Sequence, residues 1–415
     1  MSTAHKLAGH FEYNPHAPGF VDDPYPTYRL MRERYPVYGY RTFRNRQFML
    51  TRYRDIKETL LNKSMVVDHL GKLMPDARHM GVSAEDAAML RRNLGRWLLF
   101  IDPPDHGRLR NLVRHDFAFS AIEKLRPFVE EQADRIFEGC AATGRMEVVS
   151  QLAQSLPAAT VGRLLGVADG KLLALAAPFR QLAGIFEQPL TLTQFRSLVV
   201  AAKELRQAVL QEIDARRGSE AHDILTAIAR SGQMSCEDEM IGFVYLLIVA
   251  GLDTTEAFIA NGINALLANR EQFRRLCDNP DLIDGAALEL ARYDSPVQFL
   301  TRIPSCDLQI EGTTIPAGSR MFMCLGSANR DEAQFADPDR LDIARPHAGQ
   351  LAFGGGIHFC LGREVALLQM RAILRRLVAF PEATVEAGSG IRRPRAIVFR
   401  GFRSLMVNLA SAGCR

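Results

Sequence analysis

The sequence has few features that would indicate disulfides, a zinc ribbon or a membrane anchor. Its seven cysteines are scattered singly without any Cys-x-x-Cys pair, which argues against both cysteine-based frameworks and favours the cytoplasm. The longest apolar run, from Phe243 to Leu252, is far shorter than the ~20 residues that cross a bilayer. The first 20 residues contain no stretch apolar enough for a signal peptide. We therefore expect a cytoplasmic protein that does not enter a membrane.

Neither sign of charge is in large excess. The formal net charge is +4, from 51 Lys and Arg against 47 Asp and Glu, which is too mild to indicate nucleic acid as a partner. The chain also lacks a linker-length run of Gly, Ser or Pro, an internal repeat and a low-complexity tract. Since 47% of its 415 residues are apolar, one large core is feasible. We expect an N-terminal arm over residues 1–20 and a single large domain over residues 21–415.

The clearest predicted element is a long helix over residues 235–269. No proline interrupts it, and Ser235 followed by Asp238 resembles a weak capping box at its start. At 1.5 Å per residue this helix would be roughly 50 Å long, enough to cross the molecule. Further helices are expected over residues 104–118, 119–142 and 282–293, and from about Cys360 to Ala379. Several shorter helices are expected over residues 151–215, with breaks around Gly166–Gly170 and Gln188–Pro189. Short strands are expected over 299–325, and a hairpin over 392–409, so the predicted class is mainly α with a smaller β region.

A glycine-rich loop leads one cysteine to the start of the last helix, in Phe353-Gly-Gly-Gly-Ile-His-Phe-Cys360-Leu-Gly-Arg363. The free N–H groups of a helix N-terminus stabilise a thiolate, and glycines let a flat macrocycle approach the backbone closely. A thiolate ligand donates electron density to iron and favours O–O cleavage. A buried structural cysteine explains the cysteine and glycines alone equally well. A phosphate loop is a weaker alternative, because no Gly-Lys-Ser/Thr ending is present.

This loop resembles the haem-binding signature of the cytochrome P450 family, in which Phe, Gly, Gly, His, Cys and Gly occur at these spacings. The resemblance runs from about residue 20 to Leu409, with the family's motifs in order. It implies the cytochrome P450 fold, a single haem domain with haem b, and Cys360 as the only iron ligand from the protein. Phe353 would pack near the sulfur and His358 would reach a haem propionate. The other implied contacts to the cofactor are Gly354, Gly362 and Ala250.

The segment Ala250-Gly-Leu-Asp-Thr-Thr255 places a carboxylate within an apolar stretch of the long helix. Gly251 costs about 1 kcal/mol relative to alanine there. Thr254 can bond the carbonyl one turn back, and an acid beside a hydroxyl suits a proton relay. Taken alone, the pattern is more typical of a helix irregularity with a solvated Asp. It resembles the family's oxygen-activation helix, which implies that Asp253 and Thr254 deliver protons to dioxygen.

Two further sets of residues are implied by the resemblance. Glu289 and Arg292 lie i, i+3 on one helix face and can pair. Arg340 resembles the third member of the family's structural Glu-Arg-Arg cluster, but Leu341 stands where the family has an aromatic residue, so Arg345 is the alternative. Haem propionates are anions that need cations and donors in a partly buried site. The resemblance gives this role to His106, Arg110, Arg302 and His358.

The implied substrate pocket is mainly apolar. Besides the region 65–99, the resemblance draws it from Leu246, Val249, Val297, Gln298, Phe299, Leu300, Val398 and Phe399, with Gln298 and Thr301 as candidate polar anchors. Such a pocket suits a polyketide, terpenoid, fatty acyl or aromatic compound equally well, either free or tethered to a carrier protein. The resemblance therefore implies a soluble bacterial-type monooxygenase of secondary metabolism that hydroxylates, epoxidises or oxidatively couples a small apolar molecule.

Electrons are expected from a separate ferredoxin or flavodoxin with its NAD(P)H reductase, because too few residues follow Cys360 for a fused redox domain. A cationic docking patch for that partner is predicted at Arg108, Arg114, Arg363, Arg371, Arg375 and Arg376. Two alternatives remain open: a peroxide-driven peroxygenase, and a haem-based sensor without turnover. The adjacent acid and alcohol disfavour both.

Overall fold

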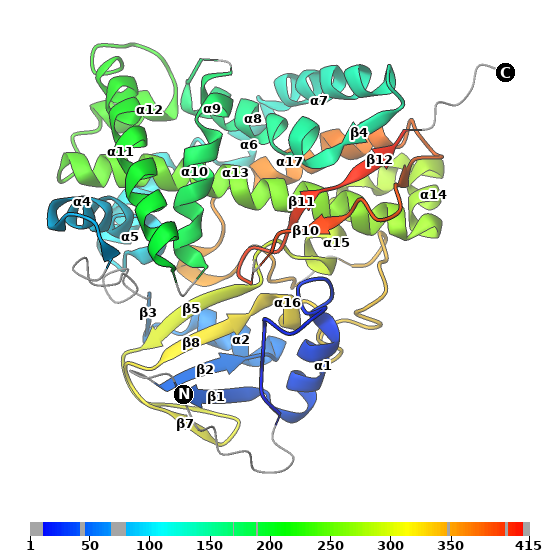
Figure 1. Cartoon of the computed structure of the whole chain (residues 1–415), viewed down its shortest axis with the longest axis horizontal. Coiled ribbons are helices and arrows are strands. Elements are labelled where there is room, and N and C mark those ends of the chain that lie inside the picture. Colours follow the sequence, from blue (N-terminus) through cyan, green and yellow to red (C-terminus); the bar gives the residue numbers. More distant parts are fainter. Residues whose placement is uncertain are drawn as a thin grey trace.

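The computed structural model describes residues 11–41, 46–67, 80–168, 170–187, 190–346, 349–394 and 397–409. Helices dominate it, as predicted, and the main β-sheet lies below most of them in Figure 1. The helices are α1 (Tyr25–Arg34), α2 (Tyr53–Leu61), α4 (Ala84–Gly95), η2 (Leu98–Phe100), α5 (Asp105–Val113), α6 (Phe119–Glu123), α7 (Arg126–Ala141), η3 (Val148–Ala153), α8 (Ser155–Leu165), α9 (Lys171–Ala174), α10 (Ala176–Ala183), η4 (Gly184–Phe186), α11 (Leu192–Asp214), α12 (Ile224–Arg230), α13 (Glu237–Ala268), α14 (Arg270–Asp278), η5 (Pro280–Leu282), α15 (Ile283–Tyr293), α16 (Leu325–Ala328), η6 (Gly356–His358) and α17 (Arg363–Leu377).

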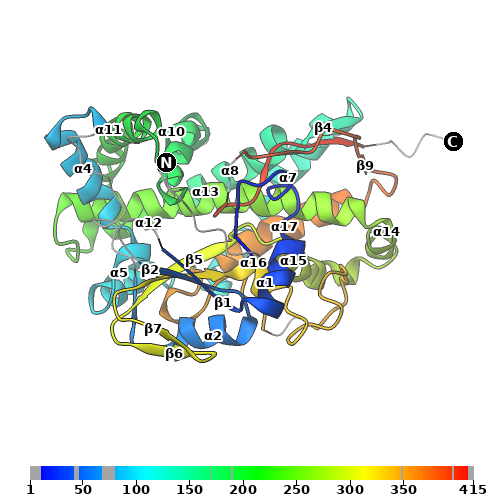
Figure 2. The same cartoon turned by 60° about the horizontal axis from the view of Figure 1, so that its bottom comes forward.

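The long helix α13 is the central element, and Figure 2 shows it crossing the molecule from side to side. Its predicted capping box is wrong. Cys236 occupies the N-cap without a side-chain hydrogen bond, and the backbone N–H of Ser235 instead donates to the Glu239 carboxylate at 2.7 Å. In the described part of the chain, α13 alone is long and apolar enough to span a bilayer. However, 78% of its most apolar 18-residue window is buried inside the protein, as in a core helix.

Two hydrophobic clusters pack against opposite parts of α13. One joins it to α7, α14, α15 and α17, and the other joins it to α4, α8, α10, α11 and α12. Gly251 permits the second contact, because a Cβ at that position would lie 2.6 Å from Cγ2 of Val161 on α8. The helix-propensity cost of Gly251 is therefore offset by close packing of two helices.

The β region contains one main sheet and three small ones. The main sheet has the order β1-β2-β8-β5-β3, in which only the β2–β8 pairing is parallel. The strands are β1 (Val37–Arg41), β2 (Arg46–Leu50), β3 (Met65–Val66), β4 (Arg145–Glu147), β5 (Phe299–Pro304), β6 (Leu308–Ile310), β7 (Thr313–Ile315), β8 (Arg320–Cys324), β9 (Thr384–Val385), β10 (Ile391–Arg392), β11 (Phe402–Ser404) and β12 (Met406–Asn408). The strands predicted within 299–325 are confirmed.

The chain ends depart from the predicted pattern. The expected C-terminal hairpin is only partly correct, since β10 pairs with β11 while β12 pairs with the distant strands β4 and β9. Residues 1–10 of the expected N-terminal arm lie outside the described residues. The described part of the arm packs on the main domain. The rings of Phe11 and Tyr13 both contact the ring of Tyr38, and Phe20 is buried. The division at residue 20 stays a prediction.

Candidate functional site

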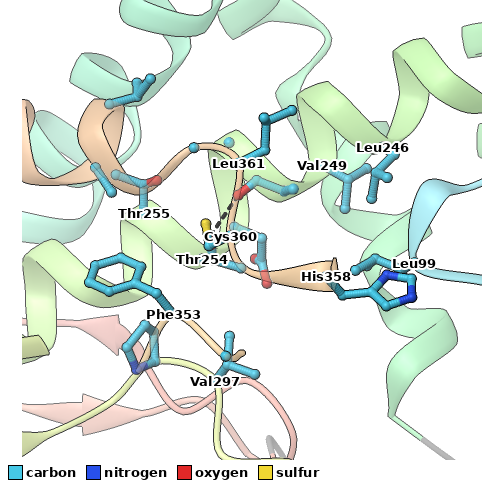
Figure 3. A pocket seen from close by; sticks show the side chains of 18 of the residues that line it. Leu99, Leu246, Val249, Thr254, Thr255, Val297, Phe353, His358, Cys360 and Leu361 are labelled. Carbon is cyan, nitrogen blue, oxygen red and sulfur yellow. Dashed lines mark hydrogen bonds between the residues drawn. The ribbon is translucent and has the colours of Figure 1, made fainter. Parts of the chain in front are cut away.

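A cavity between α13 and the loop that precedes α17 brings most of the predicted site residues together. Figure 3 shows Cys360 in the middle of its lining, with Phe353 to one side and His358 to the other. The predicted residues that line it are His106, Arg110, Leu246, Val249, Ala250, Asp253, Thr254, Val297, Phe299, Leu300, Phe353, Gly354, His358, Cys360, Gly362, Val398 and Phe399. The sequence motifs and the implied apolar wall therefore face one space.

The position of Cys360 follows from the glycine-rich loop. Its backbone N–H donates to the carbonyl of Phe353 at 3.0 Å, which closes the turn between η6 and α17. Gly356 has φ +67°, and a Cβ there would collide with the Leu60 carbonyl, so only glycine fits. Burial raises the pKa of the Cys360 thiol, while the backbone N–H of Gly362 and the charge of Arg110 oppose that rise. A bound metal cation would favour the thiolate.

Four basic side chains lie close together, those of His106, Arg110, Arg302 and His358, and all of them except Arg302 line the cavity. The rings of His106 and His358 are 4.2 Å apart, and burial lowers the pKa of His358 to about 3. Burial also lowers the pKa of His106, and that of Arg302 to about 10. The nearby carboxylate of Asp102 opposes the effect of burial on His106 and Arg302, but the pKa of each of these two side chains stays lowered. The cluster therefore has the electrostatic character of an anion site.

One atom of this cluster is buried without a partner. Nε2 of His106 makes no hydrogen bond to any residue that the structure describes. A buried polar atom of this kind normally has a partner in the functional protein. Its place beside His358 and Arg110 fits an acidic group of a ligand.

On the α13 side, the threonine and the acid have different partners. The Thr254 hydroxyl donates to the Ala250 carbonyl at 2.6 Å, as predicted. Asp253 is buried, and its Oδ1 lies 2.9 Å from Nη1 of Arg393. Arg393 also pairs with Glu256 at 2.6 Å. Nothing in the sequence indicates a role for Arg393, because it lies 140 residues from Asp253 in a segment without a motif.

The apolar residues predicted for the substrate pocket line the cavity, whereas Gln298 does not. Its amide Nε2 donates to the carbonyl of Ser295 at 2.7 Å, and its Oε1 packs against Gly326. Side chains alternate in extended backbone, so Val297 and Phe299 border the cavity while Gln298 faces the core. The assignment of Gln298 to the pocket is wrong, and Thr301 is likewise not among the lining residues. Of the predicted region 65–99, Leu98 and Leu99 border the cavity, and residues 68–79 lie outside the described chain.

Arg345, and not Arg340, completes the buried cluster around Glu289. Arg292 binds both oxygens of Glu289 at 2.8 Å, and Nε of Arg345 lies 3.1 Å from the same carboxylate. The side chain of Arg340 is 66% exposed and pairs with Asp342. The assignment of Arg340 is therefore wrong. Only its backbone carbonyl takes part, as an acceptor from Arg292 and Arg345.

Five of the six arginines predicted to form a docking patch have acidic partners within the protein, and the patch itself stays a prediction. Arg371 is only 12% exposed and pairs with Asp284 at 2.7 Å. Acidic residues also neutralise four of the others, through the pairs Arg375–Glu130, Arg376–Asp134, Arg363–Glu364 and Arg108–Glu239. Charges satisfied within the protein contribute little to steering a partner. Of the six predicted arginines, Arg114 alone has no ion pair among those found in the described chain.

The comparisons with known proteins agree with this geometry. The family model described as Cytochrome P450 matches residues 281–380, which include the Glu289 cluster and the Cys360 loop. The cytochrome P450 monooxygenase PikC of Streptomyces venezuelae is 33% identical over 399 residues, covering 94% of this chain and 91% of its own length.

Two solved structures share the fold over nearly their whole length. P450BioI in complex with an acyl carrier protein ligated to hexadec-9Z-enoic acid has a TM-score of 0.86 at 27% identity, with 94% of this chain and 100% of that one covered. The cytochrome P450 PksS of the bacillaene polyketide synthase of Bacillus subtilis 168 has a TM-score of 0.84 at 27% identity, with 96% and 100% covered.

Proposed function

Because the chain belongs to the cytochrome P450 family of haem b monooxygenases, we propose that it uses dioxygen and externally supplied electrons to oxidise an apolar organic substrate. The observation that carries this proposal is the placement of Cys360 in the same apolar cavity as Asp253 and Thr254. A thiol, an acid and an alcohol meet there although they come from motifs about 100 residues apart. Hydroxylation, epoxidation and oxidative coupling are all compatible with these residues.

Haem b fits the residues around this cavity. When bound, it supplies an iron centre that activates dioxygen. The thiolate of Cys360 would hold the iron, and Phe353 would pack beside the sulfur. His106, Arg110, Arg302 and His358 would bind the propionates, which would satisfy the unpartnered Nε2 of His106. Contacts to the flat ring would come from Ala250, Gly354 and Gly362.

Asp253 and Thr254 would manage protons for the reaction. The Thr254 hydroxyl donates its own hydrogen to Ala250, so its oxygen stays able to accept a hydrogen bond from a molecule in the cavity. Arg393 holds the Asp253 carboxylate at the edge of the same space. An acid next to a hydroxyl that faces a mainly apolar cavity suits general acid–base work.

A polyketide or fatty acyl compound is the substrate class that we propose, free or bound to a carrier protein. The cavity wall is apolar, with Leu98, Leu246, Val249 and Val297 among its members. The structural neighbours support this choice, since one was solved with an acylated carrier protein and another belongs to a polyketide synthase. Secondary metabolism is then the setting, and a cytoplasmic location accords with the six described cysteines, all of which are free.

Reconstitution tests the proposal directly. The purified holoenzyme would be supplied with NADPH, a ferredoxin and its reductase, and screened first for compounds that shift its visible spectrum. For a compound that is hydroxylated or epoxidised, we expect product that carries one oxygen atom from isotopically labelled dioxygen, whereas oxidative coupling would give a product that carries none. Product formed only with added peroxide would indicate a peroxygenase, and spectral binding without product under either condition would indicate a sensor.

A further inference from the structure

A second cavity lies beside the first. It is bordered by residues of the segment 15–21, by α10 and the start of α11, and by the segment that follows β10. Its volume is about 990 Å³. Asp253 and Phe399 line both cavities, so these two side chains form part of the wall between them. The position of Phe399 therefore decides how far the first cavity extends.

One carboxylate holds the backbone of this wall. Glu187, directly after η4, accepts hydrogen bonds from three successive backbone N–H groups, those of Ile397, Val398 and Phe399. The donor–acceptor distances are 3.1, 3.1 and 3.0 Å. Successive N–H groups that converge on one point form an anion-binding nest, and here the protein's own carboxylate fills it. We call this set of contacts the Glu187 latch.

The same backbone segment also makes contacts with the chain just before β5. The Val398 carbonyl accepts the backbone N–H of Gln298 at 2.8 Å, and Phe399 pairs with Val297 in a β-bridge. The neighbour of Glu187 adds a side-chain contact, because the ring of Phe186 meets that of Phe399 edge-on at 5.1 Å. The pocket wall is thus held between the start of β5 and the end of η4.

No other acceptor replaces this carboxylate in the part of the chain that the structure describes. All three amides direct their hydrogen bonds to Glu187. Burial raises the pKa of the Glu187 carboxyl, and the three amides oppose that rise. A half-buried carboxylate is tolerated only when such donors replace water, so the carboxylate and the amides depend on each other.

We propose that Glu187 is a positioning residue for substrate selection, which fixes Val398 and Phe399 as the end wall of the first cavity. This inference rests on the proposed function only in taking that cavity as the substrate site. Without the latch, Phe399 keeps only its contacts with Val297 and Phe186, so its ring can shift and the two cavities can join into a longer space. Glu187 then limits the length of the molecule that fits between α13 and the C-terminal segment.

Amide hydrogen exchange tests the latch itself. In Glu187→Ala holoenzyme, peptides that contain residues 397–399 are expected to exchange about tenfold faster or more, because hydrogen bonds to a charged acceptor are lost. Glu187→Gln keeps one oxygen acceptor and is expected to fall between Ala and the parent. Glu204→Gln, at an exposed position on α11, is the matched control and should leave this exchange unchanged. Unchanged protection in Glu187→Ala would overturn the proposal.

Binding of a short and a long azole to the haem iron tests whether Glu187 limits the length of the molecule that the cavity accepts. The dissociation constants of imidazole and of a biphenyl-substituted imidazole would be measured by visible titration in the parent, Glu187→Ala, Glu187→Gln and Glu204→Gln. We expect the preference for the long probe to rise severalfold in Glu187→Ala and to stay constant in Glu204→Gln. Faster exchange with an unchanged preference would refute the role in selection. Neither measurement uses dioxygen or electrons, so an enzyme that fails to oxidise any compound does not affect the outcome.

Discussion

At the scale of single residues, neighbouring side chains on α13 have separate tasks. Thr254 borders the cavity and donates a hydrogen bond to the Ala250 carbonyl, and the adjacent Thr255 is buried and also borders the cavity. The hydrogen bond of Thr254 follows from local helix geometry, and the sequence could predict it. The burial of Asp253 could not be predicted, because it depends on Arg393 from a distant segment.

Removing the Thr254 hydroxyl should uncouple electron use from product formation. In Thr254→Ala we expect haem and substrate binding to persist, while product per NADPH falls severalfold and hydrogen peroxide rises. The reason is that the cavity loses the group that hands on protons, worth about 10²-fold in typical acid–base catalysis. NADPH consumption, product and peroxide would be measured together, with Thr255→Ser as the control. Equal coupling in Thr254→Ala and the parent would remove Thr254 from the relay.

At the scale of elements, the Glu289 cluster ties α15 to the irregular segment before the Cys360 loop. The i, i+3 spacing predicted the pair Glu289–Arg292, because both residues lie on one helix. The choice between Arg340 and Arg345 depends on the path of an irregular segment, which no periodic pattern describes. The helical half of the cluster was therefore predictable, whereas the loop half stayed open between Arg340 and its alternative Arg345, of which the structure supports Arg345.

Exchange of each arginine for leucine separates the two assignments. Arg345→Leu removes one of two cations from the buried Glu289 carboxylate and should lower the free energy of unfolding by about 3 kcal/mol. Arg340→Leu changes an exposed side chain and should stay within about 0.5 kcal/mol of the parent. Urea denaturation of both variants gives the comparison. A larger loss in Arg340→Leu than in Arg345→Leu would restore the original assignment.

A second connection between elements was not visible in the sequence. Asp294, at the end of α15, binds Arg400 at 2.6 Å and Arg392 at 3.0 Å, and it accepts the Tyr25 hydroxyl at 2.7 Å. This buried carboxylate joins α1, α15 and the β10–β11 region. Although burial by itself raises the pKa of Asp294, the two arginines outweigh it and hold the pKa well below its usual range. No spacing rule relates residues from three such distant segments.

The lowered pKa of Asp294 makes a testable contribution to acid stability. The folded protein keeps this carboxylate ionised, whereas the unfolded chain binds a proton below a pH of about 3.9. Its stabilisation is therefore fully present above that pH and is lost as the pH falls toward the folded-state value. Asp294→Asn should lower the free energy of unfolding at neutral pH by about 3–5 kcal/mol and flatten its decline below pH ~4. Parallel pH profiles for variant and parent would show that Asp294 makes no such contribution.

At the scale of the whole molecule, α13 connects packing to chemistry. It contributes residues to both hydrophobic clusters and also presents Asp253 and Thr254 to the cavity. Figures 1 and 2 show its central place among the other helices. Its length and apolar character were predictable because they are properties of one continuous segment. Contacts between distant segments were not predictable, among them the pairing of β12 with β4 and the Glu187 latch. The inward turn of Gln298 was missed for the same reason, since it depends on where Ser295 and Gly326 lie.

The roles proposed for the residues of the first cavity all depend on Cys360 as the ligand of the haem iron. A thiolate ligand gives the reduced protein with carbon monoxide a red-shifted absorption band, because the sulfur donates electron density to the iron. The decisive measurement is this spectrum for Cys360→Ser, with Cys277→Ser as a control at a half-buried cysteine outside the cavity. We expect Cys360→Ser to lose the red-shifted band and Cys277→Ser to retain it fully. A red-shifted band that persists in Cys360→Ser would contradict the assignment of the site.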